Sequence, residues 1–147
     1  MSDNPNPSAA PRPSPTVDRK LGYLVLRFIL GLSIFMHGLS RLPHLQEFAD
    51  GLVKMFADTL LPAMLVHAFA LALVFVEATV GLLLLLGLWT QEALLVGSAT
   101  MALLVFGTAL RSDWNVVAIQ LLYALIYAVL LAAREYNAYS LDALIRR

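Results

Sequence analysis

Four long apolar runs constrain this chain more than any other feature of its sequence. They cover about residues 21–39, 63–89, 93–110 and 116–133, and few polar residues interrupt them. A bilayer core about 30 Å thick needs roughly 20 helical residues, and each run meets or nearly meets that length. A helix satisfies its own backbone hydrogen bonds in lipid, whereas strands would leave an open edge. The sequence therefore predicts an all-α integral membrane protein with four transmembrane helices.

The links between the later runs, residues 90–92 and 111–115, are short. Short links make antiparallel neighbours, so we expect one compact four-helix bundle over residues 21–142. The composition agrees, because 60% of the 147 residues are hydrophobic and only 14% are charged. A soluble domain of this size is only about 45–50% apolar, so the excess indicates that lipid is the solvent.

Two terminal segments lie outside this domain. Residues 1–20 hold five of the seven prolines and no apolar run, which predicts a disordered cytoplasmic tail. Residues 143–147 form a short basic C-terminal tail. The apolar run after Lys20 leads straight into more membrane sequence, so we expect a retained first helix rather than a cleaved signal peptide.

The first loop, Ser40–Pro62, has a helical pattern of its own. Its apolar residues recur at helical spacing, and its charged residues fall on another face: Leu45, Phe48, Leu52 and Phe56 against Glu47, Asp50, Lys54 and Asp58. This pattern predicts an amphipathic helix at about residues 43–61, in the first extracytoplasmic loop and lying in the membrane interface. A solvated helix packed on the bundle is the alternative.

The distribution of basic residues predicts the orientation. An even number of helices puts both termini on one side, which carries Arg12, Arg19, Lys20, Arg134, Arg146 and Arg147. The opposite side carries only Arg41, Lys54 and Arg111. Because loops rich in lysine and arginine stay inside, both termini are expected in the cytoplasm of a bacterial inner membrane.

Arg27 and Glu77 are ionisable residues within apolar runs, where an unpaired charge is costly. Counted from the cytoplasmic face, Arg27 lies roughly 9 Å deep and Glu77 roughly 18 Å deep, and a long arginine side chain can span much of that difference. The sequence therefore predicts an Arg27–Glu77 ion pair inside the bundle. Gly31 and Gly81 follow each of them by four positions, and small residues there let two helices approach closely. The pair would either set helix register or handle a ligand or proton. Alternatively, Arg27 reaches the headgroups.

A second group of candidate residues would lie near the outer surface. Equal spacing from Arg27 and Glu77 would bring His37 and His67 to a similar depth, with Gln120 and Tyr123 entering from the same side. Histidine, amide and phenol side chains suit hydrogen bonding to a quinone, whereas haem ligation has weaker support. The alternative is a close-packed helix seam, because Gln120 is followed by alanines at four-residue intervals.

Several function classes find no support in the sequence. The chain has no cysteine, which excludes disulfide exchange, thiolate-bound zinc, iron–sulfur clusters and covalently attached haem. It lacks a phosphate-binding glycine loop, a nucleophile elbow and zinc-type histidine spacing, so no metal site and no catalytic residue is assigned. No basic stripe stands apart, so a nucleic-acid partner is not expected.

Three segments resemble motifs of the DoxX family. Gly31–Leu42 reads GLSIFMHGLSRL, which is similar to the first-helix motif ending in His-Gly and a basic residue. Glu77–Thr90 reads EATVGLLLLLGLWT, which resembles the second-helix motif, and Tyr139–Asp142 resembles the closing tail of many members. Gln91 departs from the pattern, since a basic residue is common there.

The resemblance implies a four-helix bacterial inner-membrane protein associated with quinone-linked oxidoreductase systems. The positions that carry over from the family are Arg27, His37, Gly38, Arg41, Glu77 and Gly81. Of these, Gly38 joins Gly31 and Gly81 as expected helix-packing glycines. Quinone is the cofactor this implies, and the lipid bilayer and membrane or peripheral oxidoreductase subunits are the partners.

Two functions compete at this point. The chain is either a quinone-interacting subunit of a membrane oxidoreductase system or a non-catalytic module that anchors or stabilises a partner enzyme. The first predicts that Glu77 borders a lipid-accessible pocket, and the second predicts a docking face, such as the helix within Ser40–Pro62. A small-solute carrier is a third class, but no glycine–proline break interrupts any apolar run.

Overall fold

The structure, a computed structural model, describes residues 15–145. Its elements in chain order are α1 (Pro15–Arg41), η1 (Leu42–His44), α2 (Leu45–Met55), α3 (Ala63–Leu86), α4 (Thr90–Leu110), α5 (Trp114–Ala132), η2 (Arg134–Tyr136) and α6 (Leu141–Ile145). No strand occurs between residues 15 and 145. The predicted all-α fold is confirmed, and α1, α3, α4 and α5 are long and apolar enough to cross a membrane.

The helix boundaries differ from the predicted ones at two informative places. Helix α1 begins at Pro15, so the last residues of the predicted tail are helical, and a proline is well suited to a first helical turn. Helix α3 ends at Leu86 because Gly87 adopts a left-handed conformation with φ of 65°. Residues 1–14 of the predicted tail, together with Arg146 and Arg147, lie outside the described residues.

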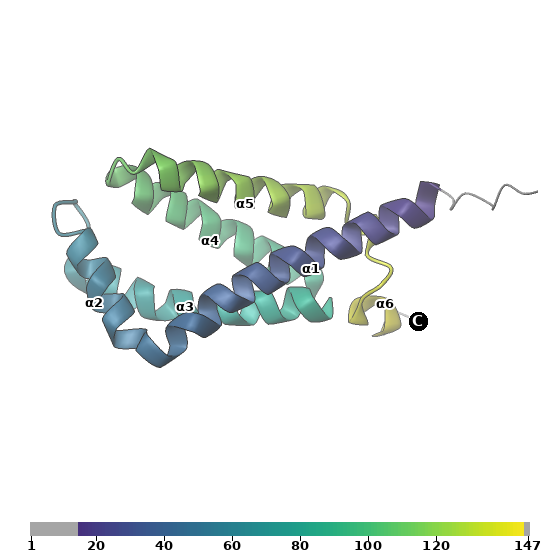
Figure 1. The fold of residues 1–147 in the computed structure, drawn as a ribbon, viewed down its shortest axis with the longest axis horizontal. Coiled ribbons are helices and arrows are strands. Elements are labelled where there is room, and N and C mark those ends of the chain that lie inside the picture. Colours follow the sequence, from purple (N-terminus) through teal and green to yellow (C-terminus); the bar gives the residue numbers. More distant parts are fainter. Residues whose placement is uncertain (1–14, 146–147) are drawn as a thin grey trace, which may run out of the picture.

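The four long helices form a ring in which neighbours differ in how closely they pack. Helix α1 packs along α3, α3 packs on α4, and α4 packs on α5, whereas the contact between α1 and α5 is the slightest of the four. Figure 1 shows α1 extending beyond the ends of the other helices, with the start of α1 and α6 at the same end of the bundle. We call this the terminal end, and the opposite end, which holds α2 and the α4–α5 turn, the loop end.

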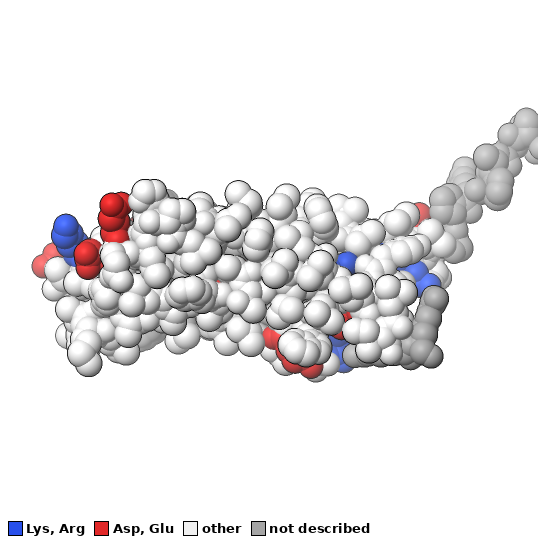
Figure 2. Space-filling view, turned by 90° about the horizontal axis from the view of Figure 1, so that it is seen from below, with Lys and Arg blue, Asp and Glu red and all other residues white. Residues whose placement is uncertain are grey.

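The surface of the bundle matches a lipid environment. Large apolar side chains such as Phe106, Leu125 and Ile119 point outward and are more than half exposed, at 59%, 59% and 58%. On the face shown in Figure 2, charged side chains gather toward the ends and leave an uncharged stretch between them. An apolar surface of this kind belongs in a bilayer. Together with the four helices of membrane-spanning length, it confirms the prediction of a multi-pass membrane protein.

The contact between α1 and α3 depends on glycines. A Cβ atom added at Gly38 would lie 2.4 Å from the backbone nitrogen of Ala78, and one added at Gly81 would lie 2.2 Å from that of Phe35. At Gly31 the nearest atom would be the backbone nitrogen of Leu85, at 2.9 Å. Real Cβ atoms do not approach backbone this closely. The close contact between α1 and α3 therefore needs a residue without a side chain at all three positions.

The segment between α1 and α3 contains a shorter helix than predicted. Helix α2 packs on the N-terminal part of α3, with Ala49 completely buried, and Asp50 Oδ1 lies 3.7 Å from His67 Nε2. The contact shows that α2 packs against the bundle. That this helix lies in the membrane interface stays a prediction.

The glycine contact can be tested with two matched variants of α1. Gly38→Ala should lower the free energy of unfolding by about 1–3 kcal/mol, because the added methyl forces α1 and α3 apart. Gly22→Ala places the same methyl in open space on the same helix and should be neutral or stabilising by up to about 1 kcal/mol. Denaturant titration in detergent, followed by circular dichroism, measures both, and equal effects would contradict the glycine contact.

Candidate functional site

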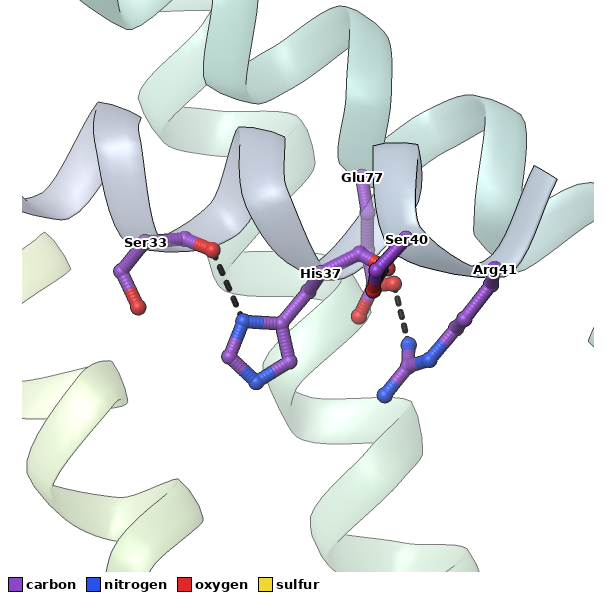
Figure 3. Close-up of polar contacts among 5 residues, drawn as sticks. All are labelled: Ser33, His37, Ser40, Arg41 and Glu77. Carbon is purple, nitrogen blue, oxygen red and sulfur yellow. Dashed lines mark hydrogen bonds and ion pairs between the residues drawn. The ribbon is translucent and has the colours of Figure 1, made fainter. Parts of the chain in front are cut away.

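Glu77 is a buried carboxylate well inside the membrane-spanning part of α3, with only 4% of its surface exposed. It lies nine residues before the end of α3 at Leu86, which corresponds to roughly 14 Å along the helix. The guanidinium of Arg41 donates a hydrogen bond to this carboxylate (Figure 3) and also lies over the ring of Phe48, 4.6 Å from its centroid. The charge of Glu77 is therefore balanced by a partner from the end of α1.

The predicted Arg27–Glu77 ion pair is wrong about the partner. The prediction placed both residues by counting from assumed helix ends, whereas the glycine contacts set the actual register of α1 on α3. Gly38 lies against Ala78, so the last turn of α1, which carries Arg41, is level with Glu77. Arg27 lies about four turns earlier on α1, beside Gly87 at the end of α3.

Arg27 instead satisfies the carbonyl end of α3. Only 1% of the residue is exposed, and its Nη1 donates to the Leu84 carbonyl and more weakly to that of Leu85, at 3.4 Å. Its Nη2 donates to the Tyr139 carbonyl at 2.8 Å. The last carbonyls of a helix have no partner within it and carry partial negative charge, so a buried arginine is stabilised there.

The start of α4 receives its cap from the C-terminal segment. The residue before the helix, Trp89, has a left-handed φ of 45° and no capping side chain. The carboxylate of Asp142 accepts hydrogen bonds from the backbone nitrogens of Trp89 and Thr90, at 2.8 and 2.9 Å. In return, the Asp142 nitrogen donates to the Gly87 carbonyl at 2.9 Å.

Arg27 and Asp142 thus fix the two sides of one turn. Close packing supports them, because a Cβ added at Gly87 would lie 2.5 Å from the Cβ of Ser140, and Asn137 donates to the Thr90 hydroxyl at 3.1 Å. We call this arrangement, Arg27 with residues 137–142 around the α3–α4 turn, the C-terminal clasp. It gives a structural reason for the closing motif Tyr139–Asp142, which the sequence suggested only by resemblance.

Where α1 meets α5, three polar side chains lie together, of which His37 is exposed and Ser33 and Tyr123 are half-buried. The His37 Nδ1 donates to the Ser33 carbonyl at 2.7 Å, because a carbonyl oxygen can only accept (Figure 3). The Tyr123 hydroxyl from α5 is 2.8 Å from the Ser33 hydroxyl, and its ring meets that of His37 edge-on, with centroids 6.3 Å apart. We call Ser33, His37 and Tyr123 the polar seam.

The other two predicted ligand residues lie elsewhere. His67 occupies the second turn of α3 beside Asp50, ten residues from Glu77 toward the loop end, so the structure does not bring it to His37. The error has the same cause as that for Arg27, since both histidines were placed with one assumed register. Gln120 donates to the Thr108 hydroxyl at 2.9 Å and joins α5 to α4.

These features define a class of protein: a multi-pass helical membrane bundle with a buried glutamate paired to a half-buried arginine, and with a polar seam between α1 and α5. The model of the DoxX family matches residues 22–110, which is well over half of the chain. The chain therefore belongs to the DoxX family, and the resemblance seen in its motifs is confirmed. Comparisons with curated proteins and with solved structures gave no match.

If Asp142 caps α4, removing its carboxylate should destabilise the protein. Asp142→Ala should lower the free energy of unfolding by about 0.5–2 kcal/mol, because the first backbone N–H groups of α4 lose their acceptor. The same variant should expose the end of the chain to carboxypeptidase sooner. Glu135→Ala is the matched control, since this exposed carboxylate lies in the same segment. Equal stability of the two variants would show that Asp142 does not cap α4.

Proposed function

We propose that this DoxX-family protein is a bacterial inner-membrane subunit that binds a quinone at the polar seam and serves a membrane oxidoreductase system. The observation that supports this most is the position of His37. It is an exposed, hydrogen-bonding side chain on a surface whose neighbours Met36 and Leu39 are apolar and also exposed, at 49% and 42%. A ligand reaching such a site travels within the bilayer.

The hydrogen-bonding groups of the seam match a quinone headgroup. With Nδ1 donating to Ser33, the neutral His37 ring has Nε2 as an acceptor, which suits the hydroxyl of a quinol. The paired hydroxyls of Ser33 and Tyr123 can turn to donate toward a quinone carbonyl. A lipid-soluble headgroup with carbonyl or hydroxyl groups could therefore bond to both helices at once.

The buried ion pair supports a neutral ligand at this place. Figure 3 shows His37 and Arg41 on neighbouring turns of α1, with Glu77 reaching between them from α3. Arg41 neutralises Glu77, so the membrane interior beside the seam carries no net charge from the pair. An uncharged headgroup avoids the large cost of bringing another ion into hydrocarbon.

The proposed orientation in the membrane and the proposed partner subunit both rest on the sequence. The terminal end carries Arg19, Lys20 and Arg134, and this excess of basic residues supports a cytoplasmic location for it. Electrons enter or leave the quinone through a partner oxidoreductase subunit, as the DoxX resemblance implies. The seam itself binds and orients the headgroup.

The alternative function, a module that anchors a partner enzyme, also has an observation in its favour. Leu60 and Met64, at the α2–α3 connection, are 93% and 86% exposed at the loop end. Apolar side chains this prominent suit an interface with another protein. In addition, the quinone prediction requires a pocket that borders Glu77. Two surface hollows, one beside the clasp and one between α3 and α4, do not border it.

The experiment is to purify the protein in mild detergent and to quantify the quinone extracted with it. His37→Ala and Tyr123→Phe should each weaken quinone binding about three- to tenfold, since each removes one hydrogen bond worth about 0.5–1.5 kcal/mol. His44→Ala, which removes an exposed histidine outside the seam, should leave the quinone content unchanged.

Two outcomes would contradict the quinone proposal. Quinone retained equally by all variants would place it outside the seam. A quinone-free protein that purifies with an intact oxidoreductase, and loses it when Leu60 and Met64 are changed to serine, would favour the anchoring module instead.

A further inference from the structure

A separate hollow lies on the outer surface between α3 and α4, and it includes none of the seam residues. Its volume is about 290 Å³, and its walls are the apolar side chains of Phe75, Val76, Val80, Leu83, Ala93 and Val96. On a membrane helix pair, an apolar hollow of this kind faces lipid. We call it the α3–α4 groove.

The shape of the groove limits what can fill it. From Phe75 to Leu83 the groove follows α3 for eight residues, or roughly 12 Å. A hollow of about 290 Å³ and this length is small and elongated, which suits one hydrocarbon chain lying along α3.

The charge at one end of the groove indicates which lipid would bind. Glu92 lines the groove in the first turn of α4, and its exposed carboxylate has no ion-pair partner among residues 15–145. The neighbouring Trp89 is 65% exposed, as expected for an aromatic residue at the headgroup level. A carboxylate at this level repels an anionic headgroup and attracts an ammonium group.

We propose that the α3–α4 groove binds one acyl chain of an ethanolamine phospholipid, with the primary ammonium of the headgroup paired to Glu92. The chain lies along Val80 and Val96, and the headgroup stays at the terminal end of the bundle. This lipid site is independent of the quinone proposal, because the two share no residue.

The test counts phospholipids retained by the purified protein in native mass spectrometry. The protein is exchanged into mixtures of phosphatidylethanolamine, phosphatidylcholine and phosphatidylglycerol with identical acyl chains. The wild-type protein should retain one phosphatidylethanolamine with a preference of about threefold over either competitor, as expected of a partly exposed ion pair.

Two pairs of variants separate the groove from its charged end. Val96→Trp fills the groove and should abolish retention, whereas Leu103→Trp adds the same ring at a 56% exposed position of α4 outside it. Glu92→Gln should keep a bound lipid but lose the preference for ethanolamine. Glu135→Gln removes an acidic group from the same end and should behave as wild type. Circular dichroism checks that each variant is folded.

The proposal is overturned by equal lipid retention in Val96→Trp and Leu103→Trp, or by a wild-type preference for phosphatidylglycerol. It is also overturned if the protein retains no lipid and appears as a dimer that Val96→Trp dissociates, since the groove would then be an interface between copies. A preference for ethanolamine that survives in Glu92→Gln would remove the role of the carboxylate.

Discussion

The close contact between α1 and α3 determines where the buried charged groups of these two helices lie relative to one another. Within lipid there is little hydrophobic drive to bring helices together, so packing and polar contacts hold them. Gly38 and Gly81 let the two backbones meet, and neither position accepts even a methyl group without movement. The register of α1 on α3 is therefore fixed at these points. It brings Arg41 to Glu77 and places Arg27 at the end of α3.

Arg27 and Arg41, both on α1, have different roles as a result. Arg41 neutralises a carboxylate inside the membrane, whereas Arg27 bonds to the carbonyl end of a helix and to the returning C-terminal segment. Asp142 completes the turn by capping α4. Each buried charge thus meets an opposite charge or helix-end dipoles, as the cost of ions in hydrocarbon requires.

Much of the fold could be predicted from the sequence, because four apolar runs of membrane length leave few alternatives. The register could not. The long helices α3, α4 and α5 are apolar on all sides, so periodicity does not show which face of each meets its neighbour. The glycines indicated a close contact, but not that Gly38 lies opposite Ala78. For this reason Arg27 and His67 were assigned the wrong neighbours, whereas the structure does bring His37 and Tyr123 into contact. The clasp was missed because the cap of α4 comes from one residue, Asp142, which lies 53 and 52 positions after Trp89 and Thr90 and leaves no local signal in the sequence.

The most direct test of this account is a double-mutant cycle between Arg41 and Glu77, measured as free energies of unfolding in detergent. Arg41→Gln and Glu77→Gln should show a coupling energy of about 0.5–3 kcal/mol, as expected for two groups in contact. The parallel cycle between Arg27→Gln and Glu77→Gln should be additive within about 0.5 kcal/mol. Coupling of Glu77 to Arg27, with additivity for Arg41, would contradict the register on which this account rests.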